Sequence, residues 1–175
     1  DNLYRDRGDI HHDLNANLYA IVKLPFGFEY QMNFTPRYHW YEYMNHESAE
    51  HPEWAGDGGR SERKNEKTFN WQVDNILRWK KEFGEDHRVE ATFLQNAEKG
   101  QWWKTVAQNK LYSPSDILGF HNIGAGTAPS VSSEDTYKTG DALMGRLFYS
   151  FKDKYMMPAS VRRDGYSAFG SMNPH

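Results

Sequence analysis

Hydrophobic and polar side chains alternate in several stretches of the chain, and the alternation is clearest between residues 28 and 43. The even positions are apolar: Phe28, Tyr30, Met32, Phe34, Pro36, Tyr38 and Trp40. The odd positions between them carry Glu29, Gln31, Asn33, Thr35, Arg37 and His39. A period of two places these two sets on opposite sides of a β-strand, whereas a helix mixes them. The stretch therefore predicts a strand with one apolar and one polar face.

Five further stretches alternate in the same way, and short turns join the stretches in pairs. Residues 14–24 precede 28–43, residues 68–83 precede 87–98, and residues 141–151 precede 155–161. In 68–83 Asn75 and Ile76 are exceptions to the alternation. Alternating runs separated by a few polar or glycine-containing residues are typical of β-hairpins. We predict an all-β fold, an antiparallel up-and-down meander of about six strands.

Two long connections, 44–67 and 99–138, separate the three predicted hairpins. Long connections are uncommon inside a compact domain and usually serve a function. In the second one, Ser113-Pro114-Ser115-Asp116 is a helix-starting signal, so we expect a short helix there. Short turns that alternate with long loops are typical of transmembrane β-barrels, which place the long loops on one side.

A barrel in a membrane would turn the apolar face to lipid and the polar face to the lumen. The predicted lipid-facing residues are Tyr30, Phe34, Phe69, Trp71, Leu77, Leu147 and Tyr149. The predicted lumen-facing residues are Asn70, Gln72, Asp74, Arg78 and Glu90. Aromatic residues near the strand ends suggest interfacial girdles: Tyr38, Trp40, Tyr41 and Tyr43 near the long loops, and Trp79, Phe83, Phe151 and Tyr155 near the short turns.

Periodicity alone does not tell which face is buried, so a soluble antiparallel sandwich or barrel remains an alternative. The function that corresponds to this soluble fold is carbohydrate binding by a β-sheet module through exposed aromatic residues. A passive porin is a third hypothesis. Two features favour the membrane barrel over a soluble fold. The apolar face is unusually aromatic for a core, and the long loops all fall on one side of the meander.

Composition narrows these hypotheses further. The chain has 175 residues, of which 15% are aromatic, and its mean hydropathy is -0.92. No apolar run approaches the roughly 20 residues of a membrane-spanning helix, which excludes a helical membrane protein. The net charge of -3 gives no reason to expect a nucleic acid partner. Cysteine is absent, which excludes thiolate metal sites, disulfides and cysteine nucleophiles within the chain.

One long motif near the end of the chain resembles a known family. Residues 139–151 are TGDALMGRLFYSF, residues 153–156 are DKYM, and residues 159–170 are ASVRRDGYSAFG. The motif closely resembles the SusC/RagA-like TonB-dependent outer-membrane transporters of Bacteroidetes. Residues 70–75, 94–99 and 113–116 also resemble segments of this family, so the resemblance extends from about Leu14 onward.

The resemblance implies that residues 1–175 form part of a larger barrel of 22 strands, without the plug domain or the TonB-contacting segment. It implies location in the bacterial outer membrane and import of a bulky nutrient, either a glycan or a peptide. The implied partners are a SusD-like surface lipoprotein and, through the missing N-terminal part, the TonB complex. Pro158 departs from the family pattern, and because proline lacks a ladder donor we predict a bulge or a local weakness there.

The chain offers little for catalysis or for metal binding. The residues His11, His12, His46, Glu47, Glu50, His51, Glu53 and Asp57 could supply metal ligands, but their spacing matches no zinc motif, so we expect no metal site and no cofactor. No serine lies in a nucleophile elbow, and the segment 124–126 lacks the rest of a phosphate loop. We therefore predict that the chain is not an enzyme.

Two groups of residues remain as candidates for other roles. Aromatic residues in or beside the long loops are candidates for substrate or lid contact: Trp54, Trp102, Trp103 and Tyr112. Packing within the loops or the girdles is the alternative role for these residues. Arg162, Arg163 and Asp164 are predicted to form a buried charge network that braces the wall, because an unpaired buried charge would be costly.

Overall fold

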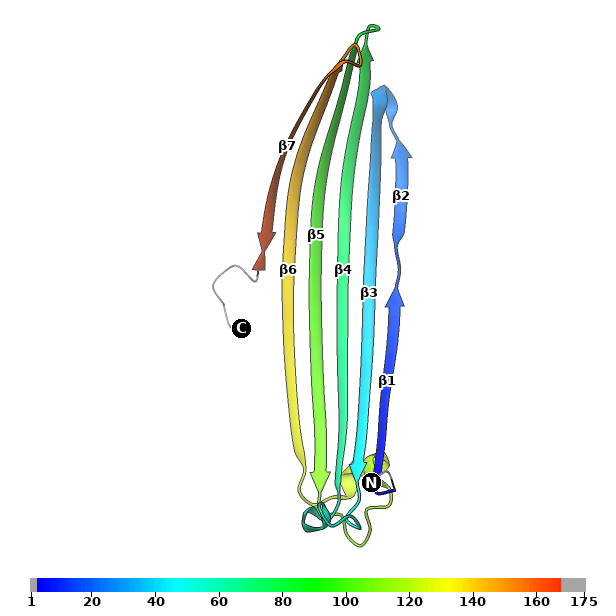
Figure 1. The fold of residues 1–175 in the computed structure, drawn as a ribbon, viewed down its shortest axis with the longest axis vertical. Helices are drawn as coiled ribbons and strands as arrows, with labels where there is room; N and C mark the ends of the chain where they lie inside the picture. Colours follow the sequence, from blue (N-terminus) through cyan, green and yellow to red (C-terminus); the bar gives the residue numbers. More distant parts are fainter. Residues whose placement is uncertain (1–2, 168–175) are drawn as a thin grey trace. The chain divides into compact units, whose positions relative to one another are not determined.

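The computed structural model describes residues 3–167, and these residues form one antiparallel sheet (Figure 1). The predicted all-β antiparallel meander is confirmed. The sheet has seven strands in the order β1-β3-β4-β5-β6-β7, and β2 also pairs with β3. The strands are β1 (Arg5–Asn15), β2 (Leu18–Lys23), β3 (Phe28–Glu47), β4 (Arg60–Phe83), β5 (His87–Lys110), β6 (Ser130–Phe151) and β7 (Tyr155–Tyr166).

The strands are longer than their hydrophobic alternation predicts. β4 begins at Arg60, β5 ends at Lys110 and β6 begins at Ser130, so about half of each predicted long loop is strand. The true connections are residues 48–59 and 111–129. In addition, the first predicted strand, 14–24, matches β2, whereas β1 was not predicted, and both strands have β3 as their neighbour. The expectation of about six strands was therefore one too few.

The expected helix after Ser113 is absent, and a 3-10 segment, η3 (Gly119–Ala125), follows instead. Two of the predicted helix-starting side chains bind elsewhere. The Ser115 hydroxyl accepts the backbone N–H of Ile117, and the Asp116 carboxylate accepts that of Ala49. The segment therefore makes turns and a contact to the other loop, and it does not start a helix.

The chain divides into two compact units, which we describe separately. The loop unit contains residues 1–14, 38–69 and 101–136, and the turn unit contains residues 15–37, 70–100 and the chain from Tyr137 onward. The loop unit holds both long connections. The turn unit holds the three short turns, which include η1 (Pro25–Gly27) and the residues 84–86 and 152–154.

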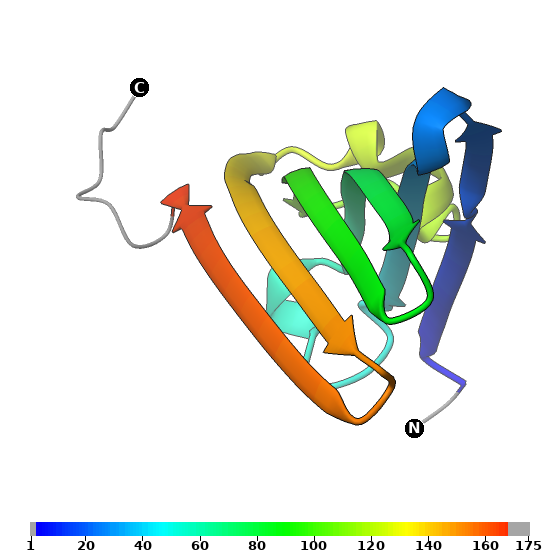
Figure 2. The same cartoon turned by 90° about the horizontal axis from the view of Figure 1, so that it is seen from above.

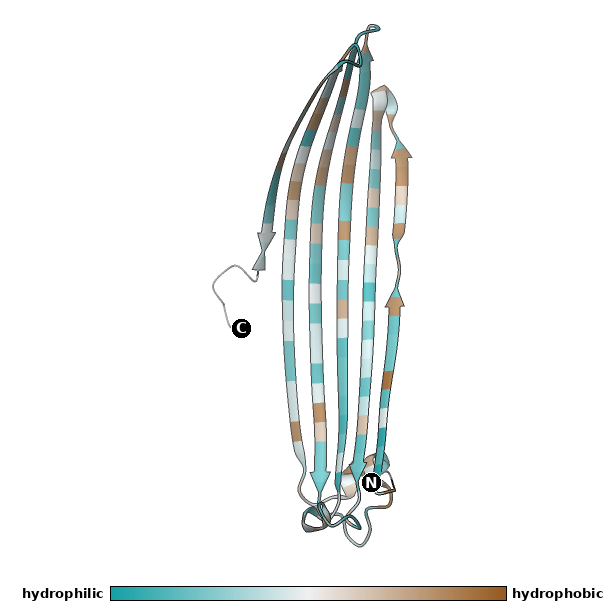
Figure 3. Cartoon of the chain, viewed as in Figure 1, coloured by the Kyte–Doolittle hydropathy of each residue, from teal (hydrophilic) through white to brown (hydrophobic). Residues whose placement is uncertain are grey.

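Side-chain contacts in the turn unit define two faces of the sheet. On the polar face, Arg78 binds Glu29 and Gln31, and Asp74 accepts a hydrogen bond from Asn96. On the apolar face, a groove of about 520 Å³ is lined by residues that include Phe28, Leu77, Trp79, Phe93 and Leu147. The hydropathy bands along each strand follow the same alternation (Figure 3). Alternation along the strands puts the predicted lumen-facing residues on the same side as Arg78 and Asp74, and the predicted lipid-facing residues on the side of Leu77. Their contact with lumen or lipid stays a prediction.

Asn75 lies on the apolar face, and its amide has two partners there. The Tyr30 hydroxyl donates to Asn75 Oδ1 at 2.5 Å, and Asn75 Nδ2 donates to Gln95 Oε1 at 2.7 Å. This relay of three polar side chains explains why Asn75 breaks the hydrophobic pattern. Each polar group is satisfied by a neighbouring strand, as a weakly polar environment requires.

Pro158 does not produce the predicted bulge. The register between β6 and β7 is continuous from Gly140↔Tyr166 to Phe151↔Tyr155, and Phe148 lies opposite Pro158. Within residues 3–167, β7 pairs with β6 alone, as the view in Figure 2 also shows. Proline is tolerated in such a position because its missing donor can face away from the ladder. The last three residues of the family motif, Ala168, Phe169 and Gly170, lie outside the described residues.

Candidate functional site

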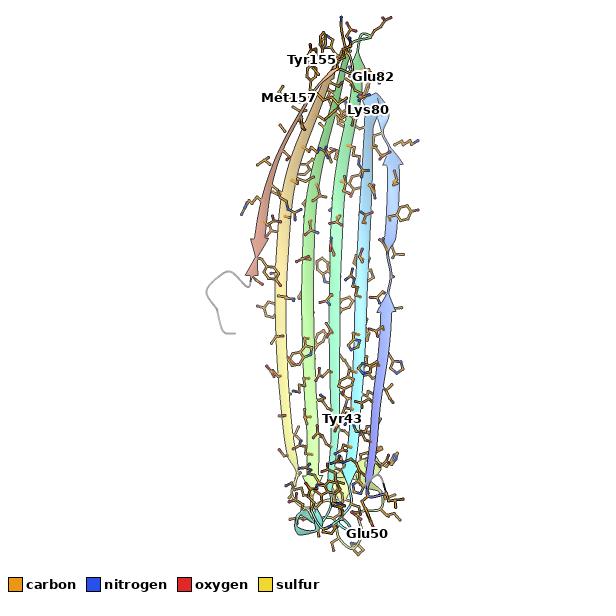
Figure 4. The ribbon with its side chains drawn as sticks, in the orientation of Figure 1. Tyr43, Glu50, Lys80, Glu82, Tyr155 and Met157 are labelled. Carbon is orange, nitrogen blue, oxygen red and sulfur yellow. The ribbon has the colours of Figure 1, made fainter. Side chains whose placement is uncertain are left out.

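The polar face of the loop unit carries a cluster of aromatic and charged side chains that touch one another. Lys64 Nζ lies 4.9 Å from the ring centre of Tyr41 and 5.5 Å from that of Tyr43. The guanidinium group of Arg7 lies 5.2 Å from the Tyr43 ring, and Tyr41 donates its hydroxyl to Asp9 at 2.8 Å. We call Arg7, Asp9, Tyr41, Tyr43, Lys64, Glu66 and Trp102 the tyrosine network. Tyr43 is labelled in Figure 4, on β3.

The tyrosine network corrects the prediction that Tyr41 and Tyr43 belong to an aromatic girdle. A strand turns successive side chains to opposite faces, so odd and even residues of β3 cannot share one belt. Tyr38 and Trp40 lie on the apolar face, where they line a separate groove, whereas Tyr41 and Tyr43 contact Lys64 on the polar face. Extending the even–odd assignment from Trp40 to the end of the stretch 28–43 would have revealed this division.

The electrostatics of the tyrosine network keep Tyr41 protonated. Burial and the hydrogen bond to Asp9 raise the pKa of Tyr41 to about 12. The same hydrogen bond, together with Arg7, lowers the pKa of Asp9. Tyr41 is therefore a donor and Asp9 an acceptor at neutral pH. The network can offer hydrogen bonds, aromatic faces and charges of both signs to a polar ligand.

The four aromatic candidates fall into different environments. Trp102 belongs to the tyrosine network, because its indole Nε1 lies 3.4 Å from Glu66 Oε2. Trp103, the next residue along β5, lies on the opposite face beside Trp40. Contact of Trp102 and Trp103 with a ligand stays a prediction.

Trp54 and Tyr112 lie inside the packed loops. Trp54 is only 8% exposed, with the His51 ring 4.4 Å away and the Arg5 guanidinium 4.9 Å from its ring centre. Tyr112 forms a β-bridge with Gly126 and meets His46 edge-on at 6.4 Å. Both aromatic rings have protein neighbours, which favours the alternative role of loop packing.

Three residues of the loop unit superficially resemble a serine hydrolase triad. His46 Nδ1 lies 2.9 Å from Ser61 Oγ, and His46 Nε2 lies 3.6 Å from Asp116 Oδ2. The ring nitrogens are exchanged relative to a catalytic triad, in which Nε2 faces the serine. Ser61 is also fully buried, with 0% exposure. The three residues therefore tie β3 and β4 to the 111–129 connection, and they present no nucleophile to a substrate.

A buried carboxylate joins the same loops to the first strand. Glu47 is 3% exposed and forms ion pairs with Arg5 at 2.8 Å and with Arg60 at 2.5 Å. Burial by itself would raise the pKa of Glu47, but hydrogen bonds from Asn45, Arg60 and Arg5 and the charge of Arg60 outweigh it and lower the pKa. Glu47 is therefore ionised, and it holds the N-terminal strand β1 against β3 and β4.

Arg162 and Asp164 pair with each other, whereas Arg163 lies on the opposite face. The Arg162–Asp164 distance is 2.8 Å, and both side chains are more than half exposed in this chain. The register places Arg163 opposite Leu143 on the apolar side. The expected buried network of three residues is therefore wrong in two respects, because the pair is exposed and Arg163 is separate from it.

The histidine-rich segments do not converge on a metal. His39 pairs with Asp13 at 2.7 Å, and the His11 ring stacks on Tyr41 at 4.6 Å. Among residues 3–167, no group of three or more histidine or acidic side chains is arranged to hold a metal ion. No helix within this range is long and apolar enough to span a membrane.

The chain is similar to known proteins in sequence and in fold. No protein-family model matches the chain. The chain is 27% identical over 125 residues to TonB-dependent receptor P26 of Formosa agariphila, which covers 70% of the chain and 12% of that protein. It is 30% identical over 104 residues to TonB-dependent receptor P39 of the same organism, covering 58% of the chain and 10% of that protein. The resemblance to SusC/RagA-like transporters is confirmed.

The fold is also found in solved structures. The structure of the RagAB peptide transporter superposes with a TM-score of 0.86 at 17% identity, over 97% of this chain and 19% of that one. The RagAB peptide importer in its closed-closed state gives a TM-score of 0.82 at 16% identity. The chain thus spans between about a tenth and a fifth of the length of these proteins. The names of these similar proteins describe receptors and transporters, and none of them names an enzyme.

Proposed function

We propose that the chain forms part of the wall of a TonB-dependent transporter in the bacterial outer membrane. In this proposal its strands belong to a barrel of 22 strands, with the apolar face toward lipid and the polar face toward the lumen. The 48–59 and 111–129 connections lie on the extracellular side, and the three short turns lie on the periplasmic side. Closure of the barrel by further strands would pair β7 and the β1/β2 edge, which a membrane requires because unpaired backbone groups are costly in lipid.

The observation that carries the proposal is the division of side chains between the two faces in the turn unit. The apolar face exposes large hydrophobic residues that no other element covers: Leu77, Phe93, Leu147, Met157 and Val161. Within residues 3–167 there is one sheet and no second layer over that face. A soluble sandwich would bury these side chains against another sheet, so the arrangement favours lipid as their solvent.

Adjacent residues of β4 provide a direct test. We expect a cysteine in place of Gln72 to react with a water-soluble maleimide, because the lumen is wet. A cysteine in place of Trp71 should react only with a lipid-soluble reagent, because its side chain faces the bilayer. The chain contains no native cysteine that would compete within this segment. Labelling is measured in outer membranes that contain the intact protein, and Asp74→Cys with Leu77→Cys serves as a second pair.

Equal labelling of Trp71→Cys and Gln72→Cys by the water-soluble reagent would contradict the proposal. That outcome would place both faces in water, which a wall with one face in lipid excludes. Recovery of the intact protein in a soluble fraction would contradict it independently.

The cargo that we propose is a bulky nutrient, either a glycan or a peptide, imported with a SusD-like surface lipoprotein as partner and the TonB complex as energy source. The tyrosine network supports this proposal, because it offers aromatic faces beside charges of both signs on the proposed lumen side. The similar solved structures are described as a peptide transporter, which favours the peptide. Uptake of labelled oligopeptides and labelled oligosaccharides by cells with and without the protein decides between the two classes.

A further inference from the structure

The polar face of the turn unit carries a row of apolar side chains that crosses three strands. Asn75 lies on the apolar face, so Ile76, the next residue of β4, lies on the polar one. Leu94 of β5 and Met144 of β6 fall beside Ile76 on the same face. All three side chains are partly exposed. We call Ile76, Leu94 and Met144 the aliphatic row.

Contacts between β4 and β5 place Ile76 opposite Leu94. Asn75, the residue before Ile76, donates a hydrogen bond to Gln95, the residue after Leu94, at 2.7 Å. In an antiparallel ladder the next pair along the strands is therefore Ile76 and Leu94. Two further contacts between these strands have the same register: Asn96 with Asp74 at 2.6 Å, and Lys80 with Glu90 at 3.7 Å.

Contacts between β5 and β6 place Leu94 opposite Met144. A Cβ on Gly140 would lie 2.8 Å from Glu98 Oε1, so these two residues face each other on the polar face. Four residues further along both strands, the same ladder pairs Leu94 with Met144. A contact farther along has the same register: His87 with Phe151, with ring centres 4.9 Å apart. The aliphatic row thus spans two strand spacings, about 10 Å.

The charged side chains around the aliphatic row are bonded to one another. Arg78 donates to Glu29 at 3.0 Å on one side of the row. On the other side Arg162, which lies opposite Met144, pairs with Asp164 at 2.8 Å. Adjoining apolar groups on an otherwise polar surface mark an interaction site, and an apolar centre inside a polar rim is typical of a protein interface.

The chemistry of the aliphatic row favours a protein segment over a sugar. The row has no aromatic ring on which a sugar could stack, and the paired charges beside it leave few hydrogen bonds for sugar hydroxyls. Aliphatic groups that face a wet lumen are costly, and a permanently docked segment removes that cost. The similar proteins are several times longer than this chain, and barrels of 22 strands hold a filled lumen.

We infer that the aliphatic row anchors a folded segment of the intact protein, outside residues 1–175, that fills the lumen of the barrel. This segment places apolar side chains against Ile76, Leu94 and Met144, while water and paired charges occupy the rest of the polar face. The row therefore determines how firmly the segment is held in the pore. The inference rests on the proposed function, which puts the polar face in the lumen.

The test measures maleimide labelling of Met144→Cys in outer membranes that contain the intact protein. We expect Met144→Cys to react slowly with both the water-soluble and the lipid-soluble reagent, whereas Gln72→Cys on the same face reacts quickly with the water-soluble one. Adding Leu94→Asn should raise the labelling rate of Met144→Cys about fivefold, the factor expected when roughly half of one aliphatic side chain loses its apolar contact.

Leu94→Met is the matched control, since it keeps an apolar side chain of similar volume. It should leave the labelling rate of Met144→Cys unchanged. Immunoblots of the outer membrane show whether each variant is assembled, and Ile76→Thr is a milder change with the same expected direction if Leu94→Asn is not assembled.

Three results would overturn the inference. The first is labelling of Met144→Cys as fast as that of Gln72→Cys, and the second is an equal rate with Leu94→Asn and Leu94→Met. The third is protection of Met144→Cys only after leucine-containing oligopeptides are added, because the aliphatic row would then contact cargo.

The labelling pattern of Trp71→Cys and Gln72→Cys separates this failure from a failure of the proposed function. Correct labelling at these two positions together with fast labelling of Met144→Cys overturns only the anchoring by the aliphatic row. Water-accessible labelling at both Trp71→Cys and Gln72→Cys overturns both proposals.

Discussion

At the scale of single residues, the Tyr30–Asn75–Gln95 relay on the apolar face is the clearest case of a polar group placed against the hydrophobic pattern. Each member bonds to the next, so no polar atom of the relay needs water. In lipid, an Asn without partners would be costly, whereas a satisfied one joins neighbouring strands. The relay therefore specifies how β3, β4 and β5 align.

We predict that Asn75→Leu and Tyr30→Phe are coupled in their effects on stability. A double-mutant cycle measured by urea unfolding in vesicles should give a coupling energy of about 0.6–1.7 kcal/mol, the range found for side-chain hydrogen bonds in membranes. Tyr155→Phe is the control, because its exposed hydroxyl has no partner among the described residues. Additive effects of the two substitutions would show that the relay contributes nothing.

Glu47 leads to a prediction about acid. Its pKa is lowered in the folded protein from the ordinary value of 4.5, so its contribution to stability is present above about pH 4.5 and is lost as the pH falls further. We expect the 48–59 connection to become mobile over that lower range. A fluorophore on Gly56→Cys reports this through its anisotropy, since a side chain at Gly56 meets no atom within 4 Å.

Glu47→Gln should give a mobile connection already at pH 7 and remove most of the dependence on acid. Glu50→Gln is the matched control in the same connection, because Glu50 is exposed (Figure 4) and should leave the anisotropy unchanged. An unchanged anisotropy in Glu47→Gln would mean that Arg5 and Arg60 do not hold the loop through this carboxylate.

At the scale of elements, the short turns differ in how tightly they pack. Gly27, in the turn between β2 and β3, has φ +83°, and a Cβ there would lie 2.3 Å from the carbonyl oxygen of Lys80. Gly84, in the turn between β4 and β5, has φ +66°, but a Cβ there meets no atom within 4 Å. Glycine is required at position 27 by the left-handed backbone conformation and by the close approach of Lys80. At position 84 it is required by the backbone conformation alone.

Gly84→Ala should therefore lower the free energy of unfolding by about 1–2 kcal/mol, the cost of the left-handed conformation. Gly27→Ala should lower it by clearly more, because the backbone of β4 must also move. Urea unfolding of both variants in the same vesicles measures the difference. Equal losses would show that the approach of Lys80 to Gly27 is not maintained in the membrane.

The strands themselves show what sequence patterns can and cannot predict. Residues 28–40 alternate cleanly because one side is apolar, and the predicted strand and its turn at 25–27 are confirmed. Residues 60–67 are strand as well, but Arg60, Ser61, Glu62 and Arg63 are polar on both faces. Ladder hydrogen bonds hold such a segment without any hydrophobic signal, so periodicity cannot detect it.

At the scale of the whole molecule, the resemblance in residues 139–166 predicted the sheet architecture well, because the motif belongs to one hairpin, β6–β7. The side-chain contacts within the loop unit were not predictable in the same way. Ser61 and Asp116 meet His46 from positions 15 and 70 residues away, and only the completed strand order brings them together. The tyrosine network likewise draws on β1, β3, β4 and β5, and no local pattern specifies which strands become neighbours.

The adjacent residues Trp102 and Trp103 have a consequence for how such a chain evolves. Trp102 belongs to the tyrosine network, whereas Trp103 lies beside Trp40 on the opposite face. Substitutions at these two adjacent positions are therefore selected by different surroundings. Deleting a single residue within β5 would exchange the two faces for the rest of the strand, whereas deleting two would restore them. Among natural variants of this wall, we expect insertions and deletions inside the strands to occur in even numbers, and those in the 48–59 and 111–129 connections to occur in any number.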